Sequence, residues 1–470
     1  MKMGKTESEA QASLSPDPLT AVSPLDGRYA VQTQALRRYF SEFALIRYRL
    51  KVEVEWLVAL GAEPAIGECR PLADGEAQAL RRWVEDLSVE DARSVKAREA
   101  VTRHDVKAVE YELRDQVEKL GRADLVPFVH FGCTSEDINN ISHALMLRDG
   151  LADVWLPAAQ ELVEEIRARA TATEDLPMLA HTHGQPASPT TLGKELAIFV
   201  HRLERQLRQV AGAEYLAKFS GAVGNYNAHL AAYADLDWPA FAKRFIEGFG
   251  LTQNVLTTQI ESHDYMAEVF HALARFNTLL ISYDQDMWSY ISHGYFSQKL
   301  LPGEVGSSTM PHKVNPIDFE NSEANAGLAN AVLNHLAGKL PISRMQRDLT
   351  DSSALRNVGV GVGYALLAVR SALAGTRKVE ANPARLAEDL DGEWAVLGEA
   401  VQTVLRKAGH HDAYERLKAA TQNREFSEAS FAQMLAELDI PEDDRARLKA
   451  MAPRDYVGLA AELARTVTRR

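Results

Sequence analysis

Two long stretches with helical periodicity constrain the fold of this chain most. In Lys194–Val210 and in Ser262–His293, apolar residues recur at spacings of three and four, and neither stretch contains glycine or proline. This spacing places the apolar side chains on one face of a helix. The longer helix would measure roughly 45 Å at 1.5 Å per residue. Helices of this length pack in bundles, often across subunits. The sequence therefore predicts an all-α architecture with a long-helix bundle.

The rest of the chain indicates several helical units. Strand-like alternation is sparse and does not alternate with helical segments, which disfavours a parallel-sheet enzyme. A chain of 470 residues is also too long for one simple core. We expect a disordered tail over residues 1–18, a helical domain over 19–125, a central long-helix bundle domain with the catalytic loops over 126–380 and a C-terminal helical domain over 381–470.

Helix start signals support this organisation. Ser188-Pro189, Asn315-Pro316 and Asn382-Pro383 each combine an N-capping residue with proline, which favours the first helical position. Thr134 followed by Asp137 resembles a capping box. We therefore expect helices to begin at these four places.

Composition excludes several classes of function. No run approaches the roughly 20 apolar residues that span a bilayer, and the polar segment Met1–Pro18 lacks the apolar region of a signal peptide. The two cysteines, Cys69 and Cys133, argue against a disulfide framework and fit a reducing cytoplasm. A net charge of −13 argues against nucleic acid as a partner. We expect a cytoplasmic protein without membrane contact.

The segment Leu179–Ala187 is the first candidate for chemistry. It holds His181 and His183 together with a glycine and a proline, and we expect a loop before a helix at Ser188. The two histidines are half of a zinc site at most, because no further ligand has a suitable spacing. A structural histidine is the ordinary interpretation of such a loop. A general acid or base is the alternative, because imidazole titrates near neutrality.

The segment Pro302–Pro316 is the second candidate. Its glycines and prolines exclude a regular helix, and it carries three hydroxyls, of which Ser307 is the first. Either it is a linker or it binds an anion, since it leads into a helix whose positive end begins at Asn315, beside Lys313. The hinge residues at its ends also permit a mobile lid.

The segment Arg344–Arg356 is the third candidate. Its arginines either form a solvated face or bind a phosphate or carboxylate together with the hydroxyl pair Ser352-Ser353. The following Gly359, Gly361 and Gly363 imitate part of a dinucleotide fingerprint, but no strand precedes them. Close contact between helices is the better explanation of these glycines.

Taken together, these segments resemble a known family. Gly306–Pro316 is similar to the signature of the fumarase/aspartase superfamily, and the overall pattern resembles the bacterial adenylosuccinate lyases. The similarity extends over most of the chain, and its main segments are Ser23–Tyr29, His104–Lys107, Cys133–Asp137, His183–Ala187, Gly221–Tyr226 and Arg344–Asp348.

The resemblance implies a three-domain, fumarase/aspartase-like all-α subunit whose long helices form the core of a homotetramer, with active sites built from three subunits. It also implies β-elimination of fumarate from adenylosuccinate to give AMP. A second substrate would be the succinylated carboxamide ribotide of purine synthesis (SAICAR, giving AICAR). Neither a metal nor another cofactor is implied.

Catalytic roles follow from the same resemblance. Ser307 matches the general base, His183 the general acid, and Glu320 the carboxylate that orients this histidine. A serine hydroxyl is a poor base, so we expect Lys313 and the helix end to favour its ionisation. Lys313 and Asn315 are also expected to stabilise the dianion formed in the reaction.

Substrate contacts are implied for further residues. Thr134 and Ser135 match positions that hold the other carboxylate, and Asp105 and Gln259 match contacts to the purine side or the succinyl group. His104 is expected to contact phosphate or substrate. The positions that match phosphate and ribose contacts are Arg28, Tyr29, Arg347, Ser352 and Arg356. The remaining implied substrate contacts are Arg103, Val314, Asn321 and Ser353.

Three alternatives remain open from the sequence. Another member of the superfamily, such as an argininosuccinate lyase, would share the chemistry but not the substrate. A metal-dependent hydrolase would use His181 and His183. A non-catalytic helical scaffold would have kept only the fold, but Ser307, His183, Lys313 and Glu320 occurring together argue against it.

Overall fold

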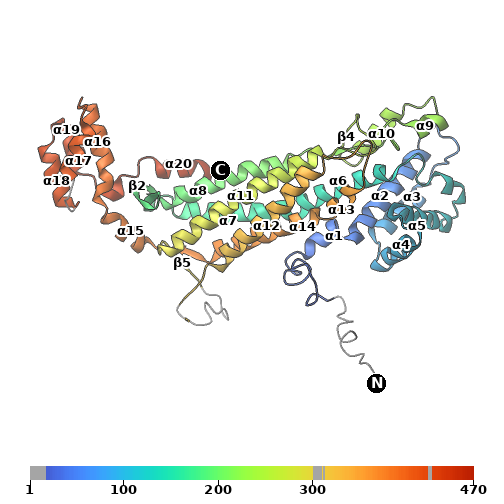
Figure 1. The fold of residues 1–470 in the computed structure, drawn as a ribbon, viewed down its shortest axis with the longest axis horizontal. Helices are drawn as coiled ribbons and strands as arrows, with labels where there is room; N and C mark the ends of the chain where they lie inside the picture. Colours follow the sequence, from blue (N-terminus) through green and yellow to red (C-terminus); the bar gives the residue numbers. More distant parts are fainter. Residues whose placement is uncertain (1–16, 300–309, 311–312, 422–425, 470) are drawn as a thin grey trace, which may run out of the picture. The chain divides into compact units, whose positions relative to one another are not determined.

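The computed structural model describes residues 17–299, 310, 313–421 and 426–469, and these residues are mainly helical (Figure 1). This confirms the predicted all-α class. Residues 1–16 of the predicted tail lie outside the described residues. The same holds for Ser307 and for most of the segment 302–316.

Backbone contacts divide the chain into two compact units. Unit 1 consists of Met1–Ala159, Gln206–Thr278 and Ala324–Ala368, and unit 2 consists of Gln160–Arg205, Leu279–Glu323 and Val369–Arg470. The predicted domain boundaries at residues 125 and 380 are not tested by this division and stay predictions.

Five long helices contribute to both units: α7 (Leu156–Ala172), α8 (Leu192–Ala211), α11 (Asp264–Ser292), α12 (Ile317–Lys339) and α14 (Val358–Lys378). The bounds of α8 and α11 confirm the two helices predicted from periodicity. In unit 2, the ring of Tyr283 on α11 packs against Phe199 of α8 and Phe319 of α12. Gly375 of α14 faces the same Phe319 ring, so four helices meet there.

Unit 1 adds shorter helices around its part of these long ones. They are η1 (Gln34–Leu36), α1 (Arg37–Phe40), α2 (Glu42–Gly61), α3 (Asp74–Glu85), α4 (Val89–Thr102), α5 (Asp105–Lys119), η2 (Ala123–Phe128), α6 (Ser135–Gly150), the π-helical η3 (Leu151–Trp155), α9 (Asn227–Ala232), α10 (Trp238–Glu247) and α13 (Thr350–Leu355). Two short parallel strands, β3 (Leu216–Ala217) and β4 (Thr252–Gln253), pair in the same unit. Trp56 of α2 anchors an aromatic core with Phe219 and Phe245.

Unit 2 contains two antiparallel strand pairs, β1 (Pro177–Thr182) with β2 (Gln185–Thr191) and β5 (Phe296–Gln298) with β6 (Val379–Ala381). Its C-terminal helices are α15 (Pro383–Asp391), η4 (Trp394–Leu397), α16 (Gly398–Lys407), α17 (Ala413–Thr421), α18 (Glu428–Glu437), α19 (Glu442–Lys449), η5 (Pro453–Asp455) and α20 (Ala460–Thr468). They have an apolar core of their own that includes Leu397, Val401, Phe431 and Leu435.

The glycines of α14 confirm the predicted close helix contact. A Cβ atom on Gly359 would lie 2.4 Å from Cβ of Phe40, and one on Gly361 would lie 3.0 Å from a methyl group of Leu333. Larger side chains at these positions would push the neighbouring helices apart. These glycines therefore permit close packing between helices.

Three of the four expected helix starts agree with the structure. Asn382 caps α15, with its side chain accepting the Arg385 amide at 3.3 Å. The Asp137 carboxylate accepts the Thr134 amide at 2.8 Å at the start of α6, and α12 begins directly after Pro316. The Ser188-Pro189 prediction is wrong, because these residues belong to strand β2. Helix α8 begins three residues later, where the Thr191 hydroxyl accepts the Lys194 amide at 3.2 Å.

One described segment has the length and composition of a membrane span. It is Thr350–Lys378, with a mean hydropathy of 1.5 in its most apolar window. However, 67% of that window is buried inside the protein. A helix in the core of a protein is buried to this extent. The segment is therefore only weak evidence that the chain crosses a membrane.

Candidate active site

Three of the predicted substrate contacts in unit 1 form the junction between α4 and α5. Arg103 ends α4 in the left-handed conformation, with φ of 51°. His104 caps α5, and its Nδ1 atom accepts the Lys107 amide at 3.1 Å. Asp105 is the first residue of α5. The tight turn at Arg103 therefore places three consecutive side chains at one helix start.

Asp105 is held by two arginines. Its carboxylate accepts a hydrogen bond from the guanidinium of Arg49 at 2.7 Å and from that of Arg356 at 3.3 Å. Burial alone would raise the pKa of this carboxyl group, but the Arg49 charge and hydrogen bond, joined by Arg356, lower it to about 2. Asp105 is thus ionised at neutral pH and fixed in position.

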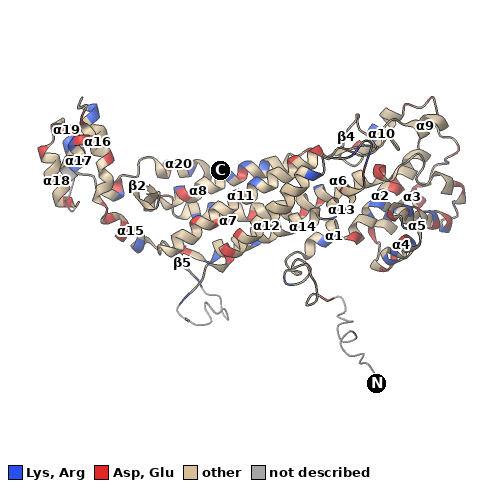
Figure 2. Cartoon of the chain, viewed as in Figure 1, with Lys and Arg blue, Asp and Glu red and all other residues tan. Residues whose placement is uncertain are grey.

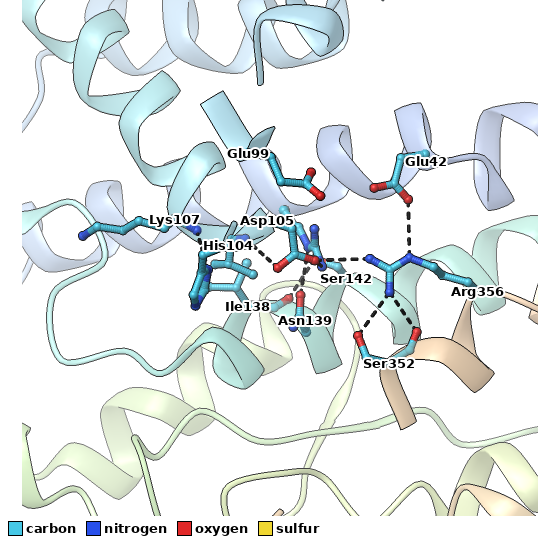
Figure 3. Close-up of polar contacts among 12 residues, drawn as sticks. Glu42, Glu99, His104, Asp105, Lys107, Ile138, Asn139, Ser142, Ser352 and Arg356 are labelled. Carbon is cyan, nitrogen blue, oxygen red and sulfur yellow. Dashed lines mark hydrogen bonds and ion pairs between the residues drawn. The ribbon is translucent and has the colours of Figure 1, made fainter. Parts of the chain in front are cut away.

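Arg356 connects several of the predicted site residues. Figure 3 shows its guanidinium between Asp105, Glu42 and Ser352. It donates to the carbonyl oxygen and the hydroxyl of Ser352 at 2.9 and 3.1 Å, and lies 3.6 Å from the Glu42 carboxylate. Since its side chain is 40% exposed, Arg356 can also reach an anion in solvent.

Arg347 is bound to a buried acid. Its guanidinium lies 2.9 Å from the carboxylate of Glu136, in the first turn of α6, and 3.7 Å from that of Asp351. Burial raises the pKa values of Glu136 and Asp351, although the Arg347 charge opposes this in both. Arg347 therefore holds α6 beside α13.

Thr134 and Ser135 occupy the N-terminal end of α6, and both are half-buried. The amide groups at this end carry partial positive charge, so the position suits a carboxylate. Two acids follow directly, Glu136 and Asp137, and both are buried.

The structure does not join every predicted contact to this network. Arg28 lies over the ring of its neighbour Tyr29, at 5.9 Å from the ring centre. A cavity of about 350 Å³ between the segment from Ser23 to Glu42 and Arg356 is lined by neither Arg28 nor Tyr29. Gln259 donates to the carbonyl of Ala222 at 2.9 Å. Ser353 is exposed on α13, next to Ser352.

In unit 2, His183 occupies the tip of a hairpin, which corrects the loop expected over Leu179–Ala187. Thr182 and Gln185 are paired, so His183 and Gly184 form a two-residue turn, with φ of 55° and 71°. Positive φ at both central residues is typical of the tight hairpin turn that matches strand twist. The side chain of His183 is exposed at this tip.

The region around the start of α12 holds the other predicted residues of unit 2. Lys313 is exposed, and the carbonyl of Val314 accepts the side-chain amide of Gln298 at 2.9 Å. Asn315 is half-buried just before α12.

Glu320, in the first turn of α12, accepts a hydrogen bond from the indole of Trp288 at 3.2 Å. Asn321 follows it on the same helix. Glu320 thus has a partner on α11 that the sequence did not suggest.

Sequence reasoning missed two buried cations, Arg49 and Lys218. Arg49 lies in the apolar stripe of α2 that contains Leu45, Val52 and Trp56, which are all buried. A charged residue among the apolar positions of a helix indicates a buried ion pair, because a buried charge requires a partner. The segment around Lys218 gives a similar signal, because its flanking residues are apolar.

The described part of the chain contains no group of three or more His, Cys, Asp or Glu side chains arranged to hold a metal. His181 instead stacks on His293, with ring centres 5.2 Å apart. Burial, followed by the neighbouring His293, lowers the pKa of His181.

Comparison with known proteins shows the class of protein to which this chain belongs. Residues 27–332 match the family model described as lyase, and residues 343–457 match the one described as adenylosuccinate lyase C-terminal. Two solved structures share the fold: 3-carboxy-cis,cis-muconate lactonizing enzyme from Pseudomonas putida and fumarate lyase from Mesorhizobium sp. BNC1. Their TM-scores are 0.70 and 0.73, their identities 23% and 19%, and each match covers 93% of this chain and 96% or 97% of the other. The chain is therefore a lyase with the fumarase/aspartase-like fold.

Relatives that match nearly the whole chain narrow this class to one family. Adenylosuccinate lyase of Escherichia coli (strain K12) is 52% identical over 94% of this chain and 97% of its own length. The same enzyme of Vibrio cholerae is 52% identical over 95% of this chain and 98% of its own length. The chain belongs to the adenylosuccinate lyase family, a family of purine nucleotide biosynthesis.

Proposed function

We propose that this protein cleaves adenylosuccinate into AMP and fumarate, and SAICAR into AICAR and fumarate, in the cytoplasm. The observation that carries the proposal is 52% identity to adenylosuccinate lyases over nearly the whole of both chains. The arginine network of unit 1 supports it, because Arg356 is partly exposed and suits a phosphate.

The proposed reaction is an anti-elimination. Ser307 removes a proton from the carbon β to the C–N bond, and the electron pair left behind delocalises into the adjacent carboxylate. The C–N bond then breaks, and His183 gives a proton to the departing purine amine. Deprotonation of Ser307 is favoured by the Lys313 cation, and Lys313 and Asn315 stabilise the dianion.

The exposed hairpin tip suits the proposed acid. The two-residue turn places the His183 imidazole at the exposed tip of the hairpin, away from the core. Glu320 is proposed to orient this imidazole, and its hydrogen bond to Trp288 restricts the carboxylate. A homotetramer with sites shared by three subunits would bring these groups together.

Direct assay tests the substrate. Purified protein is expected to convert adenylosuccinate to AMP and fumarate in equal amounts, with full activity retained after exhaustive chelation of metals. Cleavage of argininosuccinate instead would refute the substrate while leaving the chemistry. Loss of activity on chelation would favour a metal-dependent enzyme using His181 and His183.

Mixing of variants tests the shared sites. Ser307→Ala and His183→Ala proteins are each expected to lose most of their activity. Refolding the two together should restore part of the activity, because some sites in a mixed tetramer receive both intact residues. Absence of any recovery, with tetramers formed, would refute sharing, as would a fully active monomer.

A further inference from the structure

The first turn of α6 carries two buried carboxylates where the proposed function requires a substrate carboxylate to bind. Glu136 and Asp137 directly follow Thr134 and Ser135. Negative side chains stabilise the start of a helix, but they also repel an anionic ligand at the same place. Each of these acids must therefore be neutralised if the helix end is to attract an anion.

The structure provides one cation for each acid. Arg347 lies 2.9 Å from Glu136, as described above. Nζ of Lys218 lies 2.8 Å from Asp137, and the side chains of both Lys218 and Asp137 have no exposed surface. Lys218 follows strand β3, far from α6 in the sequence, so the pair also links two distant segments.

The Lys218–Asp137 pair is held by further hydrogen bonds. Asp137 accepts the backbone amides of Thr134 at 2.8 Å, Ser220 at 2.9 Å and Gly221 at 3.1 Å. Nζ of Lys218 also donates to the Gly221 carbonyl at 2.9 Å. The side-chain amide of Asn140 binds the backbone of Lys218 twice: its oxygen accepts the Lys218 amide at 2.9 Å, and its nitrogen donates to the Lys218 carbonyl at 3.0 Å. The cation is thus held at a fixed place behind the end of α6.

We propose that Lys218 is a positioning residue for substrate binding: it cancels the charge of Asp137 and so lets the N-terminal end of α6 hold a substrate carboxylate. This inference rests on the proposed function, in which Thr134 and Ser135 take that carboxylate. Lys218 itself does not touch the substrate, because it is enclosed by protein. The ligand group concerned is the fumarate-forming dicarboxylate arm, not the nucleotide phosphate.

Three variants separate charge from structure. Lys218→Met removes the cation and keeps much of the volume, so it leaves the Asp137 carboxyl group without its cationic partner. Asp137→Asn removes the carboxylate and keeps a hydrogen-bond acceptor. Lys218→Met/Asp137→Asn removes both charges, and replacing both members of a buried pair is tolerated far better than replacing one.

Inhibition by the two products gives the decisive measurement. The inhibition constant of fumarate and the KM of adenylosuccinate are expected to rise about tenfold or more in Lys218→Met, because an unpaired like charge about one helical turn away is felt strongly in a buried site. Inhibition by AMP should not change. In the double variant, fumarate inhibition should return toward the parent value, which a purely structural role of Lys218 would not produce.

Lys407→Met serves as a control for the loss of an ion-paired lysine at an exposed position, with a side chain 65% exposed. Lys407 pairs with Asp444 at 2.9 Å in the C-terminal part of unit 2, and neither is a predicted substrate contact. Its inhibition constants should equal those of the parent protein.

Either of two results would overturn the inference. One is fumarate inhibition in Lys218→Met that equals that of the parent protein, and the other is a double variant that binds fumarate as weakly as Lys218→Met does. Should Lys218→Met fail to fold, Asp137→Asn decides, because it is expected to bind fumarate at least as tightly as the parent, and weaker binding contradicts charge cancellation. A parent protein inactive on adenylosuccinate would instead refute the proposed function.

Discussion

The predicted site residues of the two units differ in how they are held. In unit 1, Asp105, Arg347 and Arg356 are joined to one another or to buried partners by ion pairs. In unit 2, His183 and Lys313 are exposed, and Glu320 has one hydrogen bond from Trp288. These three residues, all expected to bind substrate, are thus held in place by ion pairs, whereas His183, the expected acid, is presented to solvent.

This contrast has a physical reason. Binding benefits from fixed charges, because each group already ordered costs less entropy when the ligand arrives. Proton transfer requires instead that the acid and base reach the reacting atoms, and apo enzymes often leave such contacts loose. Figure 2 shows Lys and Arg interspersed with Asp and Glu along the helices, so pairing within the chain is available in both units.

The largest effect is expected at the hairpin tip. His183→Asn should lower kcat for adenylosuccinate by about 10²–10⁴-fold, the usual contribution of a general acid. Asparagine is chosen because it tolerates the left-handed backbone at this position, with φ of 55°. Steady-state kinetics with a circular dichroism check would measure this. His181→Asn is the control and should retain most activity. Equal losses in both would mean that the hairpin, not its imidazole, is required.

A large loss of stability is expected in the unit 1 network. Arg49→Met should reduce the free energy of unfolding by about 3–5 kcal/mol, since it leaves the Asp105 carboxylate without its main buried partner. Urea unfolding monitored by fluorescence would test this. A change below about 1 kcal/mol would show that the pair behaves like a surface ion pair.

A smaller effect concerns pH. The pKa of Asp105 is lowered from its ordinary value of 3.8 to about 2. Its contribution to stability is therefore complete above about pH 4 and is lost as the pH falls toward 2. After discounting for partial exposure, it amounts to about 1–2 kcal/mol. Asp105→Asn should show a flatter decline of the unfolding free energy over this range. An unchanged pH profile would contradict the assignment.

The smallest effect is expected for an exposed arginine–carboxylate pair with the same contact distance of 2.7 Å. Arg81 binds Glu55 through two hydrogen bonds of 2.7 Å, but its side chain is 44% exposed. Arg81→Met should change the unfolding free energy by about 1 kcal/mol or less. Comparison with Arg49→Met in the same urea series isolates the effect of burial. Equal losses would remove the distinction between the two pairs.

The long helices could be predicted from the sequence because the apolar spacing that specifies a helix lies within the segment itself. Apolar spacing over Ser262–His293 was enough to place α11 within two residues of its observed bounds. The small-residue contacts of α14 were also predicted, since only close packing explained Gly359 and Gly361 without a preceding strand. The family resemblance supplied the candidate residues of the site, including those outside the described part.

What could not be predicted depends on distant partners. The β1–β2 hairpin was missed because its strands carry prolines and polar residues instead of alternating apolar ones, so the pairing at Thr182 and Gln185 had no local signal. Lys218 and Asp137 are 81 residues apart in the sequence. No periodicity connects such residues, and only the folded chain reveals that each neutralises the other.

The hairpin that carries His183 also limits how this protein can change in evolution. Its register is fixed from Pro177↔Thr191 to Thr182↔Gln185, with one irregularity between Met178 and Ala180. Adding or deleting one residue in either arm would turn every following side chain to the opposite face. Point substitutions in the arms preserve this register, whereas single-residue length changes do not. We therefore expect descendants of this gene to vary in composition between residues 177 and 191 while keeping the number of residues constant.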